Sequence, residues 1–407
     1  MFTFSFSRSW VLSAGIALLA NIGVVRTSQA ADDFMTALTG GKVLLNVRYR
    51  YELVDQDGIS TRSHASTVRT RLGYVTDEYR GFSALLEMEN TTDAFDDDYT
   101  VPAASPHGPK EAGEAVIADP IFTEVNQAWL QYVIPNVASL RYGRERVILD
   151  NARFIGNVGW RQNEQTFDAF TVRSDVITDT TLFYSYFSNA NTVIGADRDM
   201  RSHIINATYS GFAVGKLTAY GYLLDFDGDD DGTDTATVGV RFKGDYDVNE
   251  GLTLLYTAEF ANQSDYEDSD NIDENYYRLV AGGTVKKITG KIGYEVLEGD
   301  GTVAFQTPLA TLHAMNGWAD KFLTTPASGL EDLFVSIGGT VRGIKLLGVY
   351  HDFSANDGGA DYGTEIDLLA AYKYNKNFST GVKYANYDAD DLATDTKKYW
   401  LWGQLSF

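Results

Sequence analysis

The chain has 407 residues, and its formal net charge of -23 excludes a nucleic-acid-binding protein because such a surface repels phosphate. It has no cysteine and only 7 prolines, whereas 25 tyrosines, 22 phenylalanines and 38 glycines favour long, aromatic-rich strands. Beyond the first 30 residues no segment has the ~18 to 20 continuous apolar residues of a membrane helix, which excludes a helical membrane protein.

The N-terminal segment indicates an export signal. Arg8 provides a positive charge, residues 10–25 are apolar, and Ser28, Gln29 and Ala30 form the small-x-small pattern that precedes signal peptidase cleavage. The apolar stretch is short for a transmembrane anchor. We therefore expect residues 1–30 to be a signal peptide and residues 31–407 to form one domain.

From residue 42 onward, apolar and polar side chains alternate with a period of two. In residues 43–53 the odd positions are apolar or aromatic, and the even positions are mostly Asn, Arg and Glu. Such strands have one face for lipid and one for water. We count about 18 strands, with 16 as the alternative, and predict a transmembrane antiparallel up-and-down β-barrel. The strands are expected to begin near residues 42, 65, 81, 122, 138, 165, 179, 201, 213, 235, 251, 275, 288, 331, 343, 362, 378 and 397.

The predicted connections alternate between short and long. Residues 135–136 and 342–343 are short turns, whereas residues 93–120, 148–163 and 298–330 are long. Short periplasmic turns that alternate with long extracellular loops are typical of barrels in the outer membrane of Gram-negative bacteria. Lipid and lipopolysaccharide are then the expected surroundings.

The final strand closes the predicted ring. Residues 399–407 alternate and end at Phe407, and a terminal aromatic residue of this kind resembles the signal that the barrel assembly machinery recognises. The last strand must pair with the first, because an open edge would leave backbone groups unpaired in lipid.

The polar strand faces are predicted to line a water-filled lumen. One interpretation is a basic ladder that guides anionic solutes; the alternative is that these charges merely pair across strands with inward acids such as Glu52, Glu87, Glu89, Glu259, Glu295, Glu365 and Asp367. By alternation the inward bases are Arg48, Arg50, Arg69, Arg71, Arg141, Arg173, Arg241, Lys243 and Arg278.

Residues 141–168 interrupt the alternation with a loop rich in Arg, Asn, Gln and aromatic residues. This stretch resembles the hallmark region of the alginate-export family of outer-membrane porins, and residues 45–52, 126–132, 349–353 and 362–367 agree with that resemblance. The resemblance implies a monomeric barrel of about 18 strands with an arginine-lined constriction formed by inward-folded loops. The candidate constriction residues are Arg144, Arg146, Arg153 and Arg161.

Other chemistry is poorly supported. Asp227, Asp229 and Asp231 match the opening of a calcium loop, but its twelfth position is Val238, so we expect no cofactor beyond loosely bound divalent cations. None of the five histidines has metal-ligand spacing. Ser202 and His203 are adjacent in a strand and point to opposite faces, which argues against an enzyme.

The sequence therefore predicts an outer-membrane channel for anionic or polar small solutes or oligosaccharides. The family resemblance offers export of an anionic polysaccharide such as alginate as an alternative, although uniformly short turns provide no element for docking a secretion apparatus. A function other than transport is also possible on this pattern: a surface adhesion barrel whose acidic loops bind its target.

Overall fold

The computed structural model describes residues 33–95, 97–108, 111, 113–228 and 233–407, so the predicted signal peptide lies outside the described residues. A short helix, α1 (Phe34–Thr39), precedes the first strand. Its N-cap is Asp33, whose Oδ1 accepts a hydrogen bond from the Thr36 amide at 3.0 Å.

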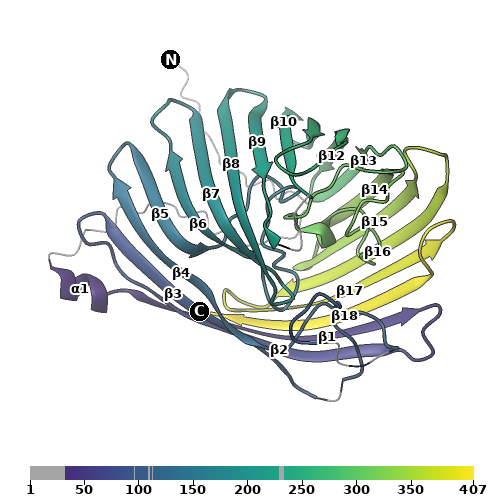
Figure 1. Ribbon diagram of the computed structural model, residues 1–407, viewed down its shortest axis with the longest axis horizontal. Coiled ribbons are helices and arrows are strands. Elements are labelled where there is room, and N and C mark those ends of the chain that lie inside the picture. Colours follow the sequence, from purple (N-terminus) through teal and green to yellow (C-terminus); the bar gives the residue numbers. More distant parts are fainter. Residues whose placement is uncertain (1–32, 96, 109–110, 112, 229–232) are drawn as a thin grey trace.

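Across the described residues, eighteen antiparallel strands form one closed sheet, as predicted (Figure 1). The ring closes where the first strand pairs with the last: the Phe407 amide donates to the Leu45 carbonyl at 2.8 Å. The strands are β1 (Lys42–Gln56), β2 (Ser63–Val75), β3 (Phe82–Asp93), β4 (Thr123–Ile134), β5 (Ala138–Glu145), β6 (Thr166–Ser174), β7 (Thr180–Asn191), β8 (Asp197–Phe212), β9 (Gly215–Leu224), β10 (Thr235–Asn249), β11 (Leu252–Ser264), β12 (Asp273–Val285), β13 (Ile288–Leu297), β14 (Leu330–Val341), β15 (Ile344–Ser354), β16 (Asp361–Lys373), β17 (Phe378–Ala389) and β18 (Thr396–Ser406).

Every strand but one begins within two residues of the predicted position, and the exception has a local cause. Strand β8 begins at Asp197, earlier than the expected residue 201, because Asp197 still pairs with Asn191 across the β7–β8 hairpin. The register shifts between Phe187 and Asn189, so this extension lies beyond a bulge and does not continue the apolar alternation.

The two faces of the sheet differ as the alternation predicts. Outward residues include Leu72, Val335 and Leu401, which are 47–55 % exposed as expected for a wall that contacts lipid. Inward residues are largely polar or aromatic, and many are covered. In the part of the chain that the structure describes, no helix is long and apolar enough for a membrane crossing.

The barrel has two unlike ends. We call the end with the connections 135–137, 286–287 and 342–343 the short-turn end, and the opposite end the long-loop end. Long connections from the long-loop end fold into the ring, and two of them contribute most of the loop residues of a buried aromatic and aliphatic core there (Figure 1). We call residues 146–165 inner loop 1 and residues 298–329 inner loop 2.

Candidate pore constriction

The two inner loops touch each other inside the barrel. The Gly156 amide donates to the Leu309 carbonyl at 2.9 Å, and the Thr311 amide donates to the Ala152 carbonyl at 2.9 Å. A Cβ at Gly156 would clash with the Thr311 hydroxyl, so this close approach requires glycine. The loops thus form one backbone-bonded unit across the lumen.

An aromatic cluster packs this unit against the barrel wall. The Phe154 ring of inner loop 1 lies 5.2 Å from Tyr220, 5.4 Å from Tyr276 and 6.0 Å from Phe305 of inner loop 2. All four side chains are buried. Aromatic pairs at these separations stabilise a core beyond the area that they bury, so the inner loops are packed like a protein interior.

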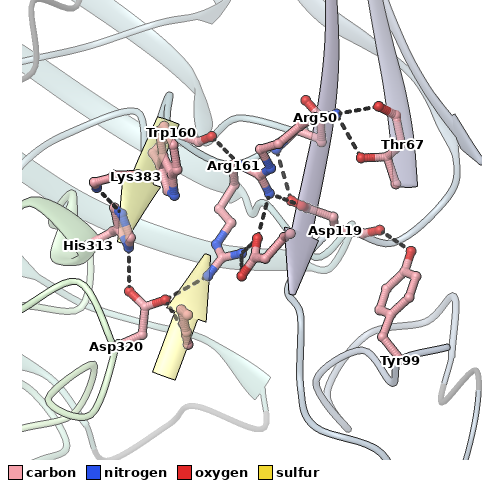
Figure 2. Close-up of polar contacts among 12 residues, drawn as sticks. Arg50, Thr67, Tyr99, Asp119, Trp160, Arg161, His313, Asp320 and Lys383 are labelled. Carbon is pink, nitrogen blue, oxygen red and sulfur yellow. Dashed lines mark hydrogen bonds and ion pairs between the residues drawn. The ribbon is translucent and has the colours of Figure 1, made fainter. Parts of the chain in front are cut away.

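Arginines of β1 hold inner loop 1 by its backbone. Arg48 donates to the Gly159 carbonyl at 3.1 Å and to the Gln162 side chain at 2.9 Å. Arg50 donates to the Trp160 carbonyl at 2.5 Å and is ion-paired with Asp119, which lies in the β3–β4 connection (Figure 2). The guanidinium donors therefore satisfy carbonyls that an irregular buried loop would otherwise leave unpaired.

Arg161 joins both inner loops to the wall. Its guanidinium is 3.0 Å from Glu52 of β1. It is also 2.7 Å from Asp320 of inner loop 2 (Figure 2). Asp320 also pairs with Lys398 of β18 at 2.8 Å. Burial alone would raise the pKa of Asp320, but His313, Lys398 and Arg161 together hold it well below its usual range.

His313 lies in the same network. Burial lowers the pKa of His313 to about 3, so its imidazole is neutral at neutral pH. The Lys383 ammonium lies 2.6 Å from His313 Nε2, and His313 Nδ1 lies 2.6 Å from Asp320 (Figure 2). An ammonium can only donate, so Nε2 accepts and Nδ1 carries the proton that Asp320 accepts.

A second buried carboxylate, Glu164, anchors the end of inner loop 1. It accepts hydrogen bonds from Arg146 at 2.8 Å and Asn126 at 2.7 Å, and lies 3.3 Å from Arg71. Burial would raise the pKa of Glu164, but Arg146 and Arg71 lower it, so the group stays ionised.

The inner loops cover a large part of the predicted basic ladder. The covered bases point inward but are at most 8 % exposed, and each contacts an inner loop, an acid or a polar wall residue. Arg153, for example, lies 2.9 Å from Glu295. Pairing of charges, which was the alternative interpretation, describes five of these bases: Arg50, Arg71, Arg153, Arg161 and Arg241. Arg48 and Arg69 donate instead to uncharged groups, namely Gln162, the Gly159 carbonyl and Asn46.

Other predicted bases keep part of their surface accessible. Side-chain exposure is 31 % for Arg141, 27 % for Arg146 and 45 % for Arg173, whereas Arg278 retains 17 % beside Glu295. Lys243 is exposed near the short-turn end. These residues, rather than the covered arginines, present cationic surface inside the ring.

Arg144 lies on the outward face of β5, not in the lumen. It follows Tyr142 and faces Asp168 on β6, with which it forms a 2.8 Å ion pair. Tyr142 and Phe170 on this strand face are exposed, whereas Arg141 and Glu145 point to the opposite, inward face. The alternation therefore turns Arg144 away from the lumen, and we omit it from the proposed constriction.

Inner loop 2 was predicted as a long connection, but its inward fold and the residues that hold it there were not predicted. Lys383 of β17 lies 3.6 Å from the centre of the Trp318 ring and 4.3 Å from that of Trp160. This loop contains Phe305, Leu309, Trp318 and Phe322, all of them buried. That apolar content is unusual for an external loop and was the signal that could have revealed its inward fold.

The calcium-loop pattern gains no geometric support. Asp227 is 3.0 Å from Arg201, and Asp229 and Asp231 lie outside the described residues. Among the residues that the structure describes, no three His, Cys, Asp or Glu side chains are grouped as metal ligands.

Solved structures with similar folds include Pseudomonas aeruginosa OccK9 (OpdG), with a TM-score of 0.74, 15 % identity, and coverage of 91 % of this chain and 100 % of that one. Acinetobacter baumannii OccAB4 has a TM-score of 0.69 and 14 % identity over 90 % and 97 % of the two chains. P. aeruginosa OpdK with vanillate has a TM-score of 0.70 and 14 % identity over 91 % and 99 %. The barrel thus has the fold of outer-membrane porins.

A search of curated proteins found no match. The family model described as alginate export matches residues 42–295, which include β1 to β12, most of β13, inner loop 1 and the arginines that hold it. The chain therefore belongs to the alginate export family.

Proposed function

We propose that the protein is a channel in the outer membrane of a Gram-negative bacterium that passes small anionic or polar solutes, including oligosaccharides. The observation that carries this proposal is an inward surface of cations toward the short-turn end. We call it the basic wall, and it consists of Lys216, Lys243, Lys291 and Lys345. Arg278, which is paired with Glu295, lies beside it near the middle of β12.

The basic wall follows from strand alternation. Lys216 of β9 faces Lys243 of β10 in register, and both are exposed on the inward face. Lys291 and Lys345, on β13 and β15, are half-buried on the same side of the sheet. Cations that line an aqueous path lower the barrier for anions and raise it for cations, so an anion preference is expected.

The inner loops favour small solutes over a polymer. They are bonded to each other, packed around Phe154 and fixed by ion pairs at Arg161 and Glu164. Moving them aside would break buried charge pairs, which is costly. Family membership nevertheless keeps export of an anionic polysaccharide as the second candidate.

The remaining features of the proposal concern surroundings and partners. The channel would function as a monomer, contact lipopolysaccharide at its long-loop end and be assembled through the terminal strand that ends at Phe407. It would catalyse no reaction and need no cofactor, with acidic loops such as that of Asp227 holding divalent cations loosely at most. One solved structure of similar fold contains vanillate, a small carboxylate, which is consistent with a path for anions.

Planar-bilayer recording tests the proposal. We expect discrete conductance steps, a reversal potential in a KCl gradient that indicates anion preference, and block by small carboxylates at lower concentration than by oligouronates. Combined Lys216→Gln, Lys243→Gln and Lys291→Gln changes should reduce the anion preference at least twofold.

The matched control removes charge at the same rim outside the inward wall, through Lys287→Gln and Lys376→Gln in the short turns. An unchanged reversal potential in the triple variant would refute the role of the basic wall. Absence of any conductance from the inserted barrel would favour the adhesion alternative, and block by oligouronates alone would favour polymer export.

A further inference from the structure

The lipid-facing wall has an open apolar hollow over β14 to β18. Its volume is about 870 Å³, and outward side chains such as Ile337, Leu368 and Leu401 form its sides. Outward small residues, Gly348 and Ala370, leave the backbone of the sheet uncovered at its floor. A flat barrel wall would have large side chains at these positions.

A second hollow continues the first toward the short-turn end. It has a volume of about 500 Å³ and shares Ala370 and Val382 with the first. Its lining also includes Tyr372, which is 40 % exposed, and Arg342 in the β14–β15 turn. The two hollows thus form a groove that is apolar along its length and ends beside a cation.

We propose that this groove binds one phospholipid from the leaflet at the short-turn end, with an acyl chain in the apolar hollows and the phosphate beside Arg342. The inference rests on the membrane placement proposed above. The groove is continuous with the exposed apolar wall formed by Val335, Ile337 and Leu401, so its natural contents are acyl chains.

A lipid in the groove differs physically from lipids around the rest of the barrel. A chain seated between walls contacts protein on several sides, whereas a chain on a convex wall contacts it on one side. An apolar hollow does not retain water, so an empty groove would forgo these contacts. The groove should therefore hold its lipid longer than the outer surface holds others.

Charge and aromatic placement select the lipid and its orientation. Arg342 offers planar donors to a phosphate, and Tyr372 lines the same end of the groove. A tyrosine there suits a headgroup, because aromatic side chains gather at membrane interfaces. The groove ends at the short turns, so the headgroup belongs to the leaflet at that end. An anionic phospholipid should be preferred over a zwitterionic one.

Native mass spectrometry can count the bound lipid directly. We would release the full-length mature barrel from micelles that contain equal amounts of phosphatidylglycerol and phosphatidylethanolamine. Wild type should retain one phospholipid per chain, with phosphatidylglycerol favoured at least threefold. Gly348→Trp with Ala370→Trp should reduce the retained fraction at least fivefold, because indole rings would fill the floor of the groove.

Gly221→Trp provides the matched control on the opposite wall. Gly221 faces outward on β9, where an added Cβ meets nothing within 4 Å; at Gly348 an added Cβ meets Leu368 at an ordinary 3.5 Å. The control should retain lipid like wild type. Arg342→Asn should abolish the preference for phosphatidylglycerol, and Asn tolerates the positive φ of 51° at this position.

Three outcomes would overturn the inference: no lipid retained by wild type, equal retention by the double Trp variant, or a wild-type dimer that the double variant converts to a monomer. The last result would assign the groove to a second copy. Conductance recorded on the same samples separates the proposals, because a conducting barrel without retained lipid refutes only the groove. A barrel that fails to insert refutes the membrane placement itself.

Discussion

Charges toward the long-loop end of the barrel interior are buried and matched, whereas charges toward the short-turn end are accessible and mostly positive. Near the long-loop end, Arg161 lies between Glu52 and Asp320, and Glu164 lies between Arg146 and Asn126. Near the short-turn end, Lys216 and Lys243 face each other on exposed strand positions. Both sets arise from the same inward alternation.

The difference shows that facing inward does not by itself make a residue part of a conduction path. An inward arginine beneath a folded loop satisfies that loop's carbonyls and carboxylates, and its charge is neutralised locally. An inward lysine with exposed surface influences a passing ion. If the proposed function holds, the wall therefore fixes the inner loops at one end and selects the solute at the other.

The largest effect is expected from Arg161→Met. This change leaves Glu52 and Asp320 buried without their shared partner, and removing one member of a buried ion pair typically costs about 3 to 5 kcal/mol. Urea unfolding in lipid vesicles, followed by electrophoretic mobility, measures it. Arg144→Met is the matched control, because Arg144 and Asp168 are partly exposed and outward, so its cost should stay below about 1 kcal/mol. Equal losses in the two variants would contradict the contrast.

Phe154→Ala should have the next largest effect. The change empties the centre of the aromatic cluster that packs inner loop 1 on the wall, and a buried Phe→Ala change costs about 3 kcal/mol or more. We expect the loops to loosen and the mean single-channel conductance to rise. A control Phe170→Ala, on the outward face of β6, should leave the conductance at the wild-type value. A destabilised variant with unchanged conductance would show that the cluster does not limit ion flow.

The strands of the barrel could be predicted from the sequence, but the contacts of the loops inside it could not. Strand positions follow from an alternation that lipid on one side and a lumen on the other impose on every strand, so local pattern determines them. The covering of Arg50 depends on Asp119 and Trp160, which are 69 and 110 positions away in the chain, and no local pattern encodes such contacts. Arg144 was grouped with the constriction because residues 141–168 were treated as one inward loop, whereas β5 continues its alternation as far as Glu145.

Stability should also depend on pH through His313. Burial lowers its folded pKa to about 3, below the usual value of 6.5, so the unfolded chain binds the proton more readily between these values. The contribution of neutral His313 to the free energy of unfolding is therefore present above its unfolded pKa of 6.5 and is lost as the pH falls toward 3. Between pH 7 and 5 this loss amounts to about 2 kcal/mol. Unfolding of wild type and His313→Asn at both pH values measures the difference. If the variant keeps the full wild-type pH dependence in this window, His313 is not its source.

The smallest expected effect is a difference in anion preference between variants of two arginines that are close in sequence, Arg146 and Arg144. Arg146 keeps 27 % of its side chain accessible inside the ring, although Glu164 neutralises part of its charge. Arg146→Gln should therefore lower the anion preference by less than about twofold, because only part of its charge is accessible to the lumen and Arg71 remains beside Glu164. Arg144→Gln removes the same charge two residues earlier on the outward face and should leave the reversal potential unchanged. A shift in Arg144→Gln equal to that in Arg146→Gln would mean that the field of the whole barrel, rather than inward exposure, sets the selectivity.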